Sequence, residues 1–321
     1  FTEIVLTTSI YVLAATKIMP GITRIFSVLT NLNYTINSIK IFNKSFFSFY
    51  KNDFSNKTGN IHKRKKIYSL ELKKIYFKYE KNLILNNLNL KIKSGEKIGI
   101  IGESGSGKTT LLKILIGLHN YDNGTVLFGD VNLNNMSKKE QRLLRQNIGM
   151  LFQGGALYDY MTVEENIMFP LTMFTNKSNK EKKERVNFCL ERVNLSGKNK
   201  LMPSELSGGM TKRVAIARAI SMQPKYLLCD EPNSGLDPKT AILIDNLIHE
   251  ITEEFDMTTI VNTHDMNSVM QIGDNIAFIY NGSIWWRGNK KEIINSENKE
   301  LNEFVFASDL FTLLKKKNEK S

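Results

Sequence analysis

Cysteine is scarce in this sequence: Cys189 and Cys229 are its only two. Each lies inside an apolar run, where a free thiol behaves as a small hydrophobic side chain. We interpret both as buried, reduced thiols of a cytosolic domain, because disulfides accumulate in oxidising compartments. The apolar content of 41% is ordinary for a globular protein, so the composition excludes a disordered chain.

The sequence also lacks an apolar run of the roughly 20 residues that cross a bilayer. The nearest is the segment from Ile4 to Leu29, whose first half is nearly uncharged and whose second half has apolar residues at helical spacing. We expect residues 1–30 to be part of a last transmembrane helix; a buried helix of a soluble domain is the alternative. A signal peptide is disfavoured, because Glu3 lies where such a peptide is positively charged.

Positive charge is unevenly distributed along the chain. Residues 1–70 hold ten Lys and Arg against two acidic residues, so +8 of the net charge of +12 lies there. A basic segment after an apolar one is typical of the cytoplasmic flank of a membrane span, where it meets anionic lipid. We therefore interpret residues 31–66 as a basic linker, with a merely solvated segment as the alternative, and expect no nucleic-acid partner.

The strongest motif is a glycine-rich segment that fits the pattern G-x-x-x-x-G-K-[ST]. An apolar run at 97–101 precedes it as an expected buried strand, and an expected helix follows at 111–115. Glycines let backbone N–H groups surround an oxyanion, while a helix N-terminus and a lysine add positive charge. We predict a nucleoside triphosphate site formed by Gly102, Glu103, Ser104, Gly105, Ser106, Gly107, Lys108, Thr109 and Thr110.

Two carboxylates end a second apolar run, at 226–229. Acidic side chains at the carboxyl end of a parallel strand, in a sheet that also carries a phosphate loop, are suited to Mg²⁺ and a hydrolytic water. We expect Asp230 to bind Mg²⁺ with the Thr109 hydroxyl, Glu231 to polarise the water, and Lys108 to bridge the β- and γ-phosphates.

Polar residues at three further positions are weaker candidates. Gln153 ends an expected strand and could contact Mg²⁺ or the water, although any loop can begin with Gln. His264 ends another and could donate to the γ-phosphate. Ser207, Gly208 and Gly209 could offer N–H groups to an anion, although a plain helix start explains them almost as well. The remaining histidines have a structural interpretation: His62, His119 and His249.

Short alternating runs between residues 70 and 92 predict a small sheet before the phosphate loop. Tyr79, near the middle of this region, could stack on adenine or be a half-buried strand residue. Further along, Asn281-Gly282 between two apolar runs predicts a hairpin. Residues 291–321 are expected to form a C-terminal helix and a basic tail.

Taken in chain order, these motifs resemble the nucleotide-binding domain of ABC transporters, over about residues 68–290. The resemblance rests on the phosphate loop, Gln153, LSGGM at 206–210, Asp230-Glu231, SGLD at 234–237 and His264. It implies an α/β fold of the P-loop NTPase class, with a RecA-like core sheet, a small antiparallel β subdomain and a helical subdomain at about 155–222. We place the domain at 67–290.

The resemblance also implies a head-to-tail homodimer in which each ATP lies between the phosphate loop of one copy and Ser207, Gly208 and Gly209 of the other. ATP and Mg²⁺ are the implied cofactors. Tyr79 would stack on adenine, Asp237 would make a cross-dimer contact, and Gln153 would couple hydrolysis to a membrane partner. The implied catalytic residues are Glu231 as general base, His264 as switch histidine, Gln153 and Lys108; the implied metal ligands are Thr109, Gln153 and Asp230.

The two ends of the chain resemble different subfamilies, as a hybrid joined between about Leu118 and Arg145 would. Residues 1–135 are similar to the end of an exporter half-transporter, and residues 140–314 to the ATPase of the Mla lipid-asymmetry system. We expect phospholipid transport at the cytoplasmic face of a bacterial inner membrane, with a permease subunit or fused transmembrane domain as partner. The alternative is a fragment of a lipid or lipid-linked-oligosaccharide flippase.

Two other functions are alternatives from different classes. A soluble ABC ATPase without a membrane partner is disfavoured, because the chain has one nucleotide domain and no long coiled-coil insertion. A module that binds ATP without hydrolysing it is disfavoured by the intact Lys108, Asp230, Glu231 and His264.

Overall fold

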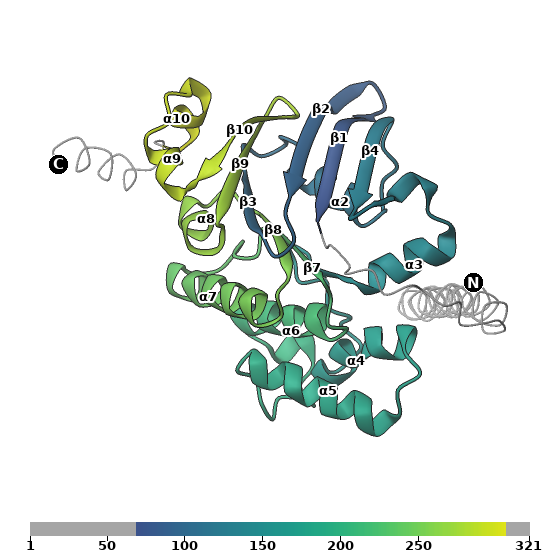
Figure 1. Cartoon of the computed structure of the whole chain (residues 1–321). Helices are drawn as coiled ribbons and strands as arrows, with labels where there is room; N and C mark the ends of the chain where they lie inside the picture. Colours follow the sequence, from purple (N-terminus) through teal and green to yellow (C-terminus); the bar gives the residue numbers. More distant parts are fainter. Residues whose placement is uncertain (1–68, 306–321) are drawn as a thin grey trace, which may run out of the picture. The chain divides into compact units, whose positions relative to one another are not determined.

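The computed structural model describes residues 69–305, which belong to one compact unit, Lys65–Ser321 (Figure 1). The expected partial transmembrane helix at 1–30 and the basic linker at 31–66 lie outside the described residues, as does the tail from residue 306. Within residues 69–305, no helix combines the length and the apolar character needed to cross a bilayer.

A six-stranded sheet in the order β10-β9-β3-β8-β7-β6 forms the centre of this unit. Its strands run parallel except β10, which pairs antiparallel with β9. Every residue of β3, β7 and β8 is buried, as in parallel sheets covered on both faces. The strands are β3 (Lys97–Ile101), β6 (Ile148–Leu151), β7 (Tyr226–Asp230), β8 (Thr258–Asn262), β9 (Asn275–Tyr280) and β10 (Ser283–Asn289).

Alternate side chains of β7 enter two different cores, because successive residues of a strand point to opposite faces. Leu227 and Cys229 belong to the cluster that contains α6 and α7 residues, whereas Leu228 packs with α2. A third cluster joins β9 to α8 and α10. The helices are α2 (Lys108–Leu115), α6 (Gly208–Ile220), α7 (Pro238–Glu254), α8 (Met266–Ile272), α9 (Lys290–Ile294) and α10 (Lys299–Val305).

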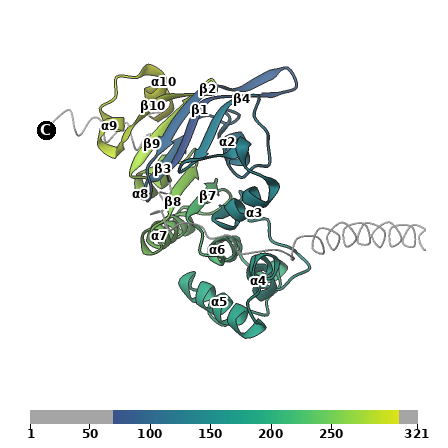
Figure 2. The ribbon, with the colours of Figure 1, turned by 45° about the vertical axis from the view of Figure 1, so that its right-hand side comes forward.

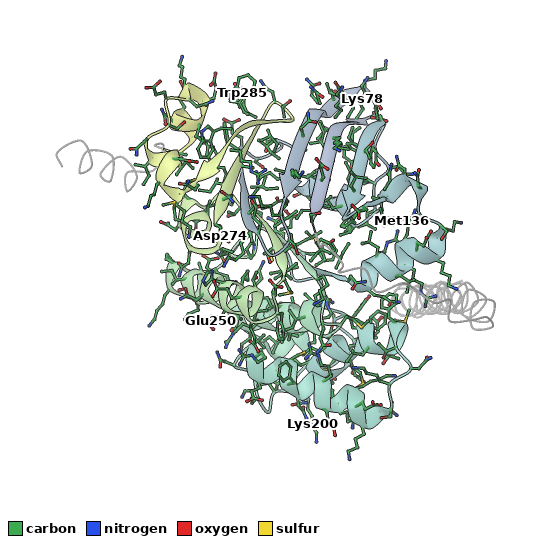
Figure 3. All side chains as sticks on the ribbon, viewed as in Figure 1. Lys78, Met136, Lys200, Glu250, Asp274 and Trp285 are labelled. Atoms are coloured by element: carbon green, nitrogen blue, oxygen red, sulfur yellow. The ribbon has the colours of Figure 1, made fainter. Side chains whose placement is uncertain are left out.

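A second, antiparallel sheet has the order β2-β1-β4-β5 and lies beside α2 (Figure 1). Its inward side chains, including Leu72 and Leu88, share a core with Ile98 of β3. In Figure 3, Lys78 and Met136 lie in this region, and Lys200 lies at the opposite end of the described unit. The elements are β1 (Leu70–Tyr79), β2 (Asn82–Ile92), β4 (Asn123–Phe128), β5 (Val131–Asn132), the 3₁₀ helix η1 (Leu133–Asn135) and α3 (Lys138–Gln146).

A group of helices lies between β6 and β7 in sequence and extends away from both sheets (Figure 2). Two of them begin with a capping box. The hydroxyls of Thr162 and Ser178 each accept a hydrogen bond from the backbone N–H of the glutamate three residues later, and that glutamate's carboxylate accepts one from the backbone N–H of the capping residue. These local signals explain why the sequence indicated helices here. The elements are α4 (Val163–Phe174), α5 (Asn179–Arg192) and the 3₁₀ helix η2 (Pro203–Glu205), which lead into α6.

The α/β fold class predicted from the sequence is confirmed by this architecture and by the solved structures it matches. The hairpin prediction is confirmed as well, because β9 and β10 pair antiparallel across Asn281 and Gly282. Both turn residues have positive φ, 48° and 74°, as a two-residue hairpin loop of this twist requires.

Gly149, in β6, provides a test of the contact between the sheet and α6. A Cβ at this position would lie 2.7 Å from the Ala219 carbonyl oxygen and 3.1 Å from Pro224 Cγ. We expect Gly149→Ala to lower the free energy of unfolding by about 1–3 kcal/mol, the usual cost of overpacking. Urea denaturation measures this, with Gly154→Ala as control because nothing lies within 4 Å of its added Cβ. Equal midpoints for the two variants would contradict the close contact.

Candidate nucleotide-binding and catalytic site

The glycine-rich segment forms a tight loop between β3 and α2. Gly102, Gly105 and Gly107 have φ values of 153°, 84° and 102°, which side-chain-bearing residues rarely adopt. A Cβ on Gly102 would lie 2.4 Å from the Ile279 carbonyl oxygen, so this glycine is also required sterically. Lys108 Nζ donates to the carbonyl oxygens of Gly102 at 2.6 Å and Glu103 at 2.9 Å. The loop is therefore wrapped around its own lysine.

Lys108 is also close to two acidic residues. Its side chain is buried, and burial lowers the pKa of the ammonium group, while the charges of Glu231 and Asp230 oppose that shift. Asp230 Oδ1 accepts hydrogen bonds from Thr109 Oγ1 at 3.0 Å and from Asn262 Nδ2 at 3.3 Å. Strands β7 and β8 pair Asp230 directly with Asn262, which explains this contact.

The oxygen atoms gathered here fit Mg²⁺, the cation that sites of this kind hold with substrate phosphates. Thr109 and Asp230 contribute a hydroxyl and a carboxylate, and two further buried oxygens, Ser106 Oγ and Asn262 Oδ1, have no hydrogen-bond partner in the described part of the chain. Residues 69–305 contain no group of three or more His, Cys, Asp or Glu that could hold a metal.

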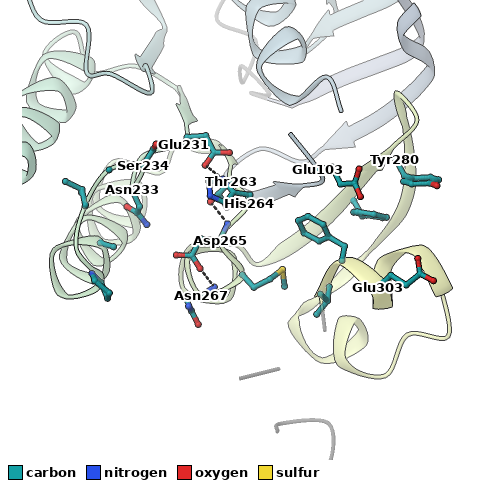
Figure 4. Close-up of a pocket in the computed structure, with 18 of the residues that line it drawn as sticks. Glu103, Glu231, Asn233, Ser234, Thr263, His264, Asp265, Asn267, Tyr280 and Glu303 are labelled. Atoms are coloured by element: carbon teal, nitrogen blue, oxygen red, sulfur yellow. Dashed lines mark hydrogen bonds and ion pairs between the residues drawn. The ribbon is translucent and has the colours of Figure 1, made fainter. Parts of the chain in front are cut away.

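Glu231 and His264 meet beside the phosphate loop (Figure 4). Glu231 Oε2 lies 2.8 Å from His264 Nδ1. The carboxylate is mostly buried, whereas the imidazole is 66% exposed. Glu231 has a φ of 48°, an unusual conformation that costs about 1–2 kcal/mol in a residue with a side chain. The sequence-predicted pair of strand-tip residues is thus brought into contact, with the glutamate held in a strained conformation.

The signature residues, Ser207, Gly208 and Gly209 of the LSGGM segment, lie at the start of α6. Ser207 is the N-cap of α6, and its Oγ accepts from Met210 N at 3.3 Å. Ser207, Gly208, Gly209 and Asp237 line a cavity of about 470 Å³, whereas Glu103, Glu231 and His264 line a different cavity of about 870 Å³. A single copy therefore does not bring the signature residues to its own phosphate loop.

Comparison with known proteins identifies the family. The family model for "ABC transporter" matches residues 85–234. The methionine import ATP-binding protein MetN of Campylobacter jejuni is 41% identical over 256 residues, which cover 75% of this chain and 76% of that protein. The chain belongs to the ABC transporter ATP-binding proteins. Members of this family are ATPases that use ATP with Mg²⁺, so the predicted enzyme class and cofactors are confirmed.

Other relatives of this ABC protein refine the comparison. The intermembrane phospholipid transport ATP-binding protein MlaF of Haemophilus influenzae is 36% identical over 236 residues, covering 74% of this chain and 89% of that protein. The dimeric, post-hydrolysis structure of the cassette MJ0796 bound to ADP and Pi matches with a TM-score of 0.64, 33% identity, and coverage of 68% and 98%. CbiO1 of Clostridium perfringens matches with a TM-score of 0.67, 30% identity, and coverage of 78% and 99%. The expected Mla resemblance is therefore supported only in part.

Two residues near the candidate nucleotide-binding site were not predicted from the sequence to belong to it. His119, interpreted as structural, has its Nε2 2.6 Å from the hydroxyl of Tyr79, a residue that is 45% exposed. Lys212 of α6 is buried; its Nζ donates to the carbonyl oxygens of Gln153 and, at 3.4 Å, Glu231. The sequence offers no local signal for either contact, because each joins residues that are far apart in the chain.

Asp245 is a third functional candidate that the sequence did not indicate. This carboxylate on α7 is 2% exposed and accepts from Asn233 Nδ2 at 2.7 Å. Burial raises the pKa of Asp245 to about 6, and hydrogen bonds from Asn233 and Ser268 oppose that rise. Its position beside the loop that follows Glu231 distinguishes it from an ordinary surface carboxylate.

The raised pKa of Asp245 predicts a pH-dependent stability. In the folded protein the Asp245 carboxyl group stays protonated up to about pH 6, whereas the ordinary pKa of an aspartate is 3.8. Its stabilising contribution is therefore full below 3.8 and is lost as the pH rises to about 6. Relative to Asp245→Asn, which cannot ionise, we expect wild type to lose on the order of 2 kcal/mol across that interval. Urea unfolding followed by circular dichroism measures the difference, and a constant difference would refute the shift.

Proposed function

We propose that this ABC ATP-binding subunit hydrolyses ATP in a head-to-tail homodimer, with two equivalent sites shared between the copies. The observation that carries the proposal is the division of these residues between two adjoining cavities: Glu231 and His264 line one, Ser207 and Asp237 line the other, and Gly235 and Leu236 border both. A second copy, turned head to tail, supplies the missing half of each site. Dimeric cassette structures such as MJ0796 support this arrangement.

In the proposed reaction, each residue has one task. Lys108 and the backbone N–H groups of its loop bind the β- and γ-phosphates, while Thr109 and Asp230 hold Mg²⁺, which neutralises phosphate charge. Glu231 accepts a proton from the attacking water. His264 Nδ1 lies 2.8 Å from Glu231 Oε2 and would hold the glutamate in place, and its imidazole would also contact the γ-phosphate. Tyr79 offers its exposed ring to the adenine.

Gln153 is proposed to link hydrolysis to the membrane partner. Its Nε2 donates to Ser234 Oγ at 3.3 Å, in the loop between Glu231 and α7. A nearby groove of about 420 Å³ is lined by Phe152, Tyr158 and Phe169, among other residues. A permease segment seated in that groove would move Gln153 and with it the loop that follows Glu231. Such a partner would hold the subunit at the cytoplasmic face of a membrane.

Relatives suggest two cargoes for the transporter. Methionine import is named for relatives of up to 41% identity. Phospholipid transport is named for the relative of which this chain covers 89%. The groove also favours phospholipid transport, because several of its lining residues lie in the segments that resemble the Mla ATPase. These residues are Phe152, Tyr158, Phe169 and Pro170. We propose methionine as the first candidate and phospholipid as the second.

Glu231→Gln tests the catalytic assignment. The substitution keeps the side-chain volume and removes the base, so we expect turnover to fall by about 10²- to 10⁴-fold while ATP binding persists. Size-exclusion chromatography with ATP and Mg²⁺ should then show a stable dimer. Glu191→Gln, on the exposed surface of α5, is the matched control and should leave turnover and oligomeric state unchanged. Unchanged turnover of Glu231→Gln would remove Glu231 from its proposed role.

Reconstitution distinguishes the two cargoes. The full chain is incorporated into proteoliposomes with the permease of a methionine importer or with the permease of an Mla system, and ATP hydrolysis is measured. The groove must fit its partner closely, so we expect only one permease to stimulate hydrolysis, by several-fold. Stimulation by the methionine permease supports the first candidate, and stimulation by the Mla permease replaces it with the second. Stimulation by neither would contradict both cargo assignments.

A further inference from the structure

A single side-chain amide joins the loop after Glu231 to two different helices. Asn233 Nδ2 donates to Asp245 Oδ1 of α7 at 2.7 Å and to Ser268 Oγ of α8 at 2.6 Å. Both partners are almost completely buried, with exposed fractions of 2% and 0%. Hydrogen bonds that involve a buried charge are stronger than neutral ones, so this amide is held firmly.

These contacts continue from Ser268 to the catalytic histidine. Ser268 Oγ donates to Asp265 Oδ2 at 3.4 Å, and the other oxygen of Asp265 accepts from Asn267 N at the start of α8. Asp265 directly follows His264, which contacts Glu231 (Figure 4). The contacts therefore form a closed ring that starts at Glu231, passes through its own loop and α8, and returns through His264.

Three residues in or beside this ring have environments or conformations that are unfavourable in free energy. Asn233 Oδ1 is buried without a hydrogen-bond partner in the described part of the chain, which is unfavourable because the atom has lost its contact with water. Asp245 is a buried carboxylate that also faces the thiol of Cys229 and the carboxylate of Asp265. Glu231 has the strained φ of 48°. Costs of this kind cluster where a structure must hold a functional geometry.

We propose that Asn233, held by Asp245 and Ser268, is a positioning residue that sets the contact between Glu231 and His264. The proposal rests on the catalytic role of Glu231 proposed above. Because Asn233 precedes Ser234, the same amide fixes the loop that Gln153 contacts. A displacement of that loop is thereby transmitted to the alignment of Glu231 and His264.

An exchange of the two side chains tests the pair. Asn233→Asp places two carboxylates against each other, so we expect kcat to fall by about 10- to 100-fold, the range for groups that orient a functional side chain. Asp245→Asn keeps an oxygen acceptor for Asn233 Nδ2 but removes the charge, so its kcat should lie between those of wild type and Asn233→Asp. The double variant Asn233→Asp/Asp245→Asn restores one donor and one acceptor and should recover most of the lost kcat.

The steady-state ATPase assay separates positioning from folding. A positioning role predicts that kcat changes while KM for ATP stays within about twofold. Thr252→Val removes another buried hydroxyl of α7, which donates to the Ile248 carbonyl at 2.7 Å, and serves as control for a loss of helix stability. If Thr252→Val lowers kcat as much as Asn233→Asp, or if the double variant stays as slow as Asn233→Asp, the proposal is wrong.

A failure of this proposal can be distinguished from a failure of the proposed catalytic base. Should Glu231→Gln turn over normally while the exchange still recovers kcat, the base assignment fails and Asn233 positions another group of the ring. Should Glu231→Gln be inactive while the exchange recovers nothing, the base assignment stands and the positioning role of Asn233 fails. Thermal denaturation of each variant shows whether the protein assayed is folded.

Discussion

The burial of a charged lysine beside two carboxylates is the constraint on which the rest of this structure depends. Lys108, the first residue of α2, donates hydrogen bonds to two carbonyl oxygens of the preceding loop, and Asp230 and Glu231 lie near it at the end of β7. Parallel pairing of β3, β8 and β7 brings these groups to one edge of the sheet. The site is therefore a concentration of opposite charges that a low-dielectric surrounding strengthens. It is prepared for an anionic ligand with a divalent cation.

The chemistry is divided between two regions of one surface. Glu231 and His264 accompany the phosphate loop, whereas Ser207 and Asp237 border a separate cavity next to α7. In the proposed homodimer, this division would make the assembly of each site dependent on a second copy. The loop between Glu231 and α7 connects the two cavities: Ser234 N donates to the Glu231 carbonyl oxygen, and Asp237 caps α7 at the other cavity.

Polar contacts buried beneath this loop distinguish the site from an ordinary phosphate-binding fold. Asn233, Asp245 and Ser268 join three segments of chain at the point where Glu231 is strained. Lys212 adds a link from α6 to the carbonyls of Gln153 and Glu231. Fully apolar residues would pack here at lower cost, since buried polar groups are expensive to desolvate. Their presence is best explained by the need for a defined and transmissible geometry.

Local sequence patterns predicted the phosphate loop, the strand-tip acids and the Asn281-Gly282 hairpin. Each depends on neighbours within a few residues, so local spacing contains the necessary information. Only the tertiary structure decided that His119 contacts Tyr79 and that Asn233 reaches both Asp245 and Ser268. Those contacts join distant parts of the chain, and their energies arise from burial, which no local pattern of one sequence encodes.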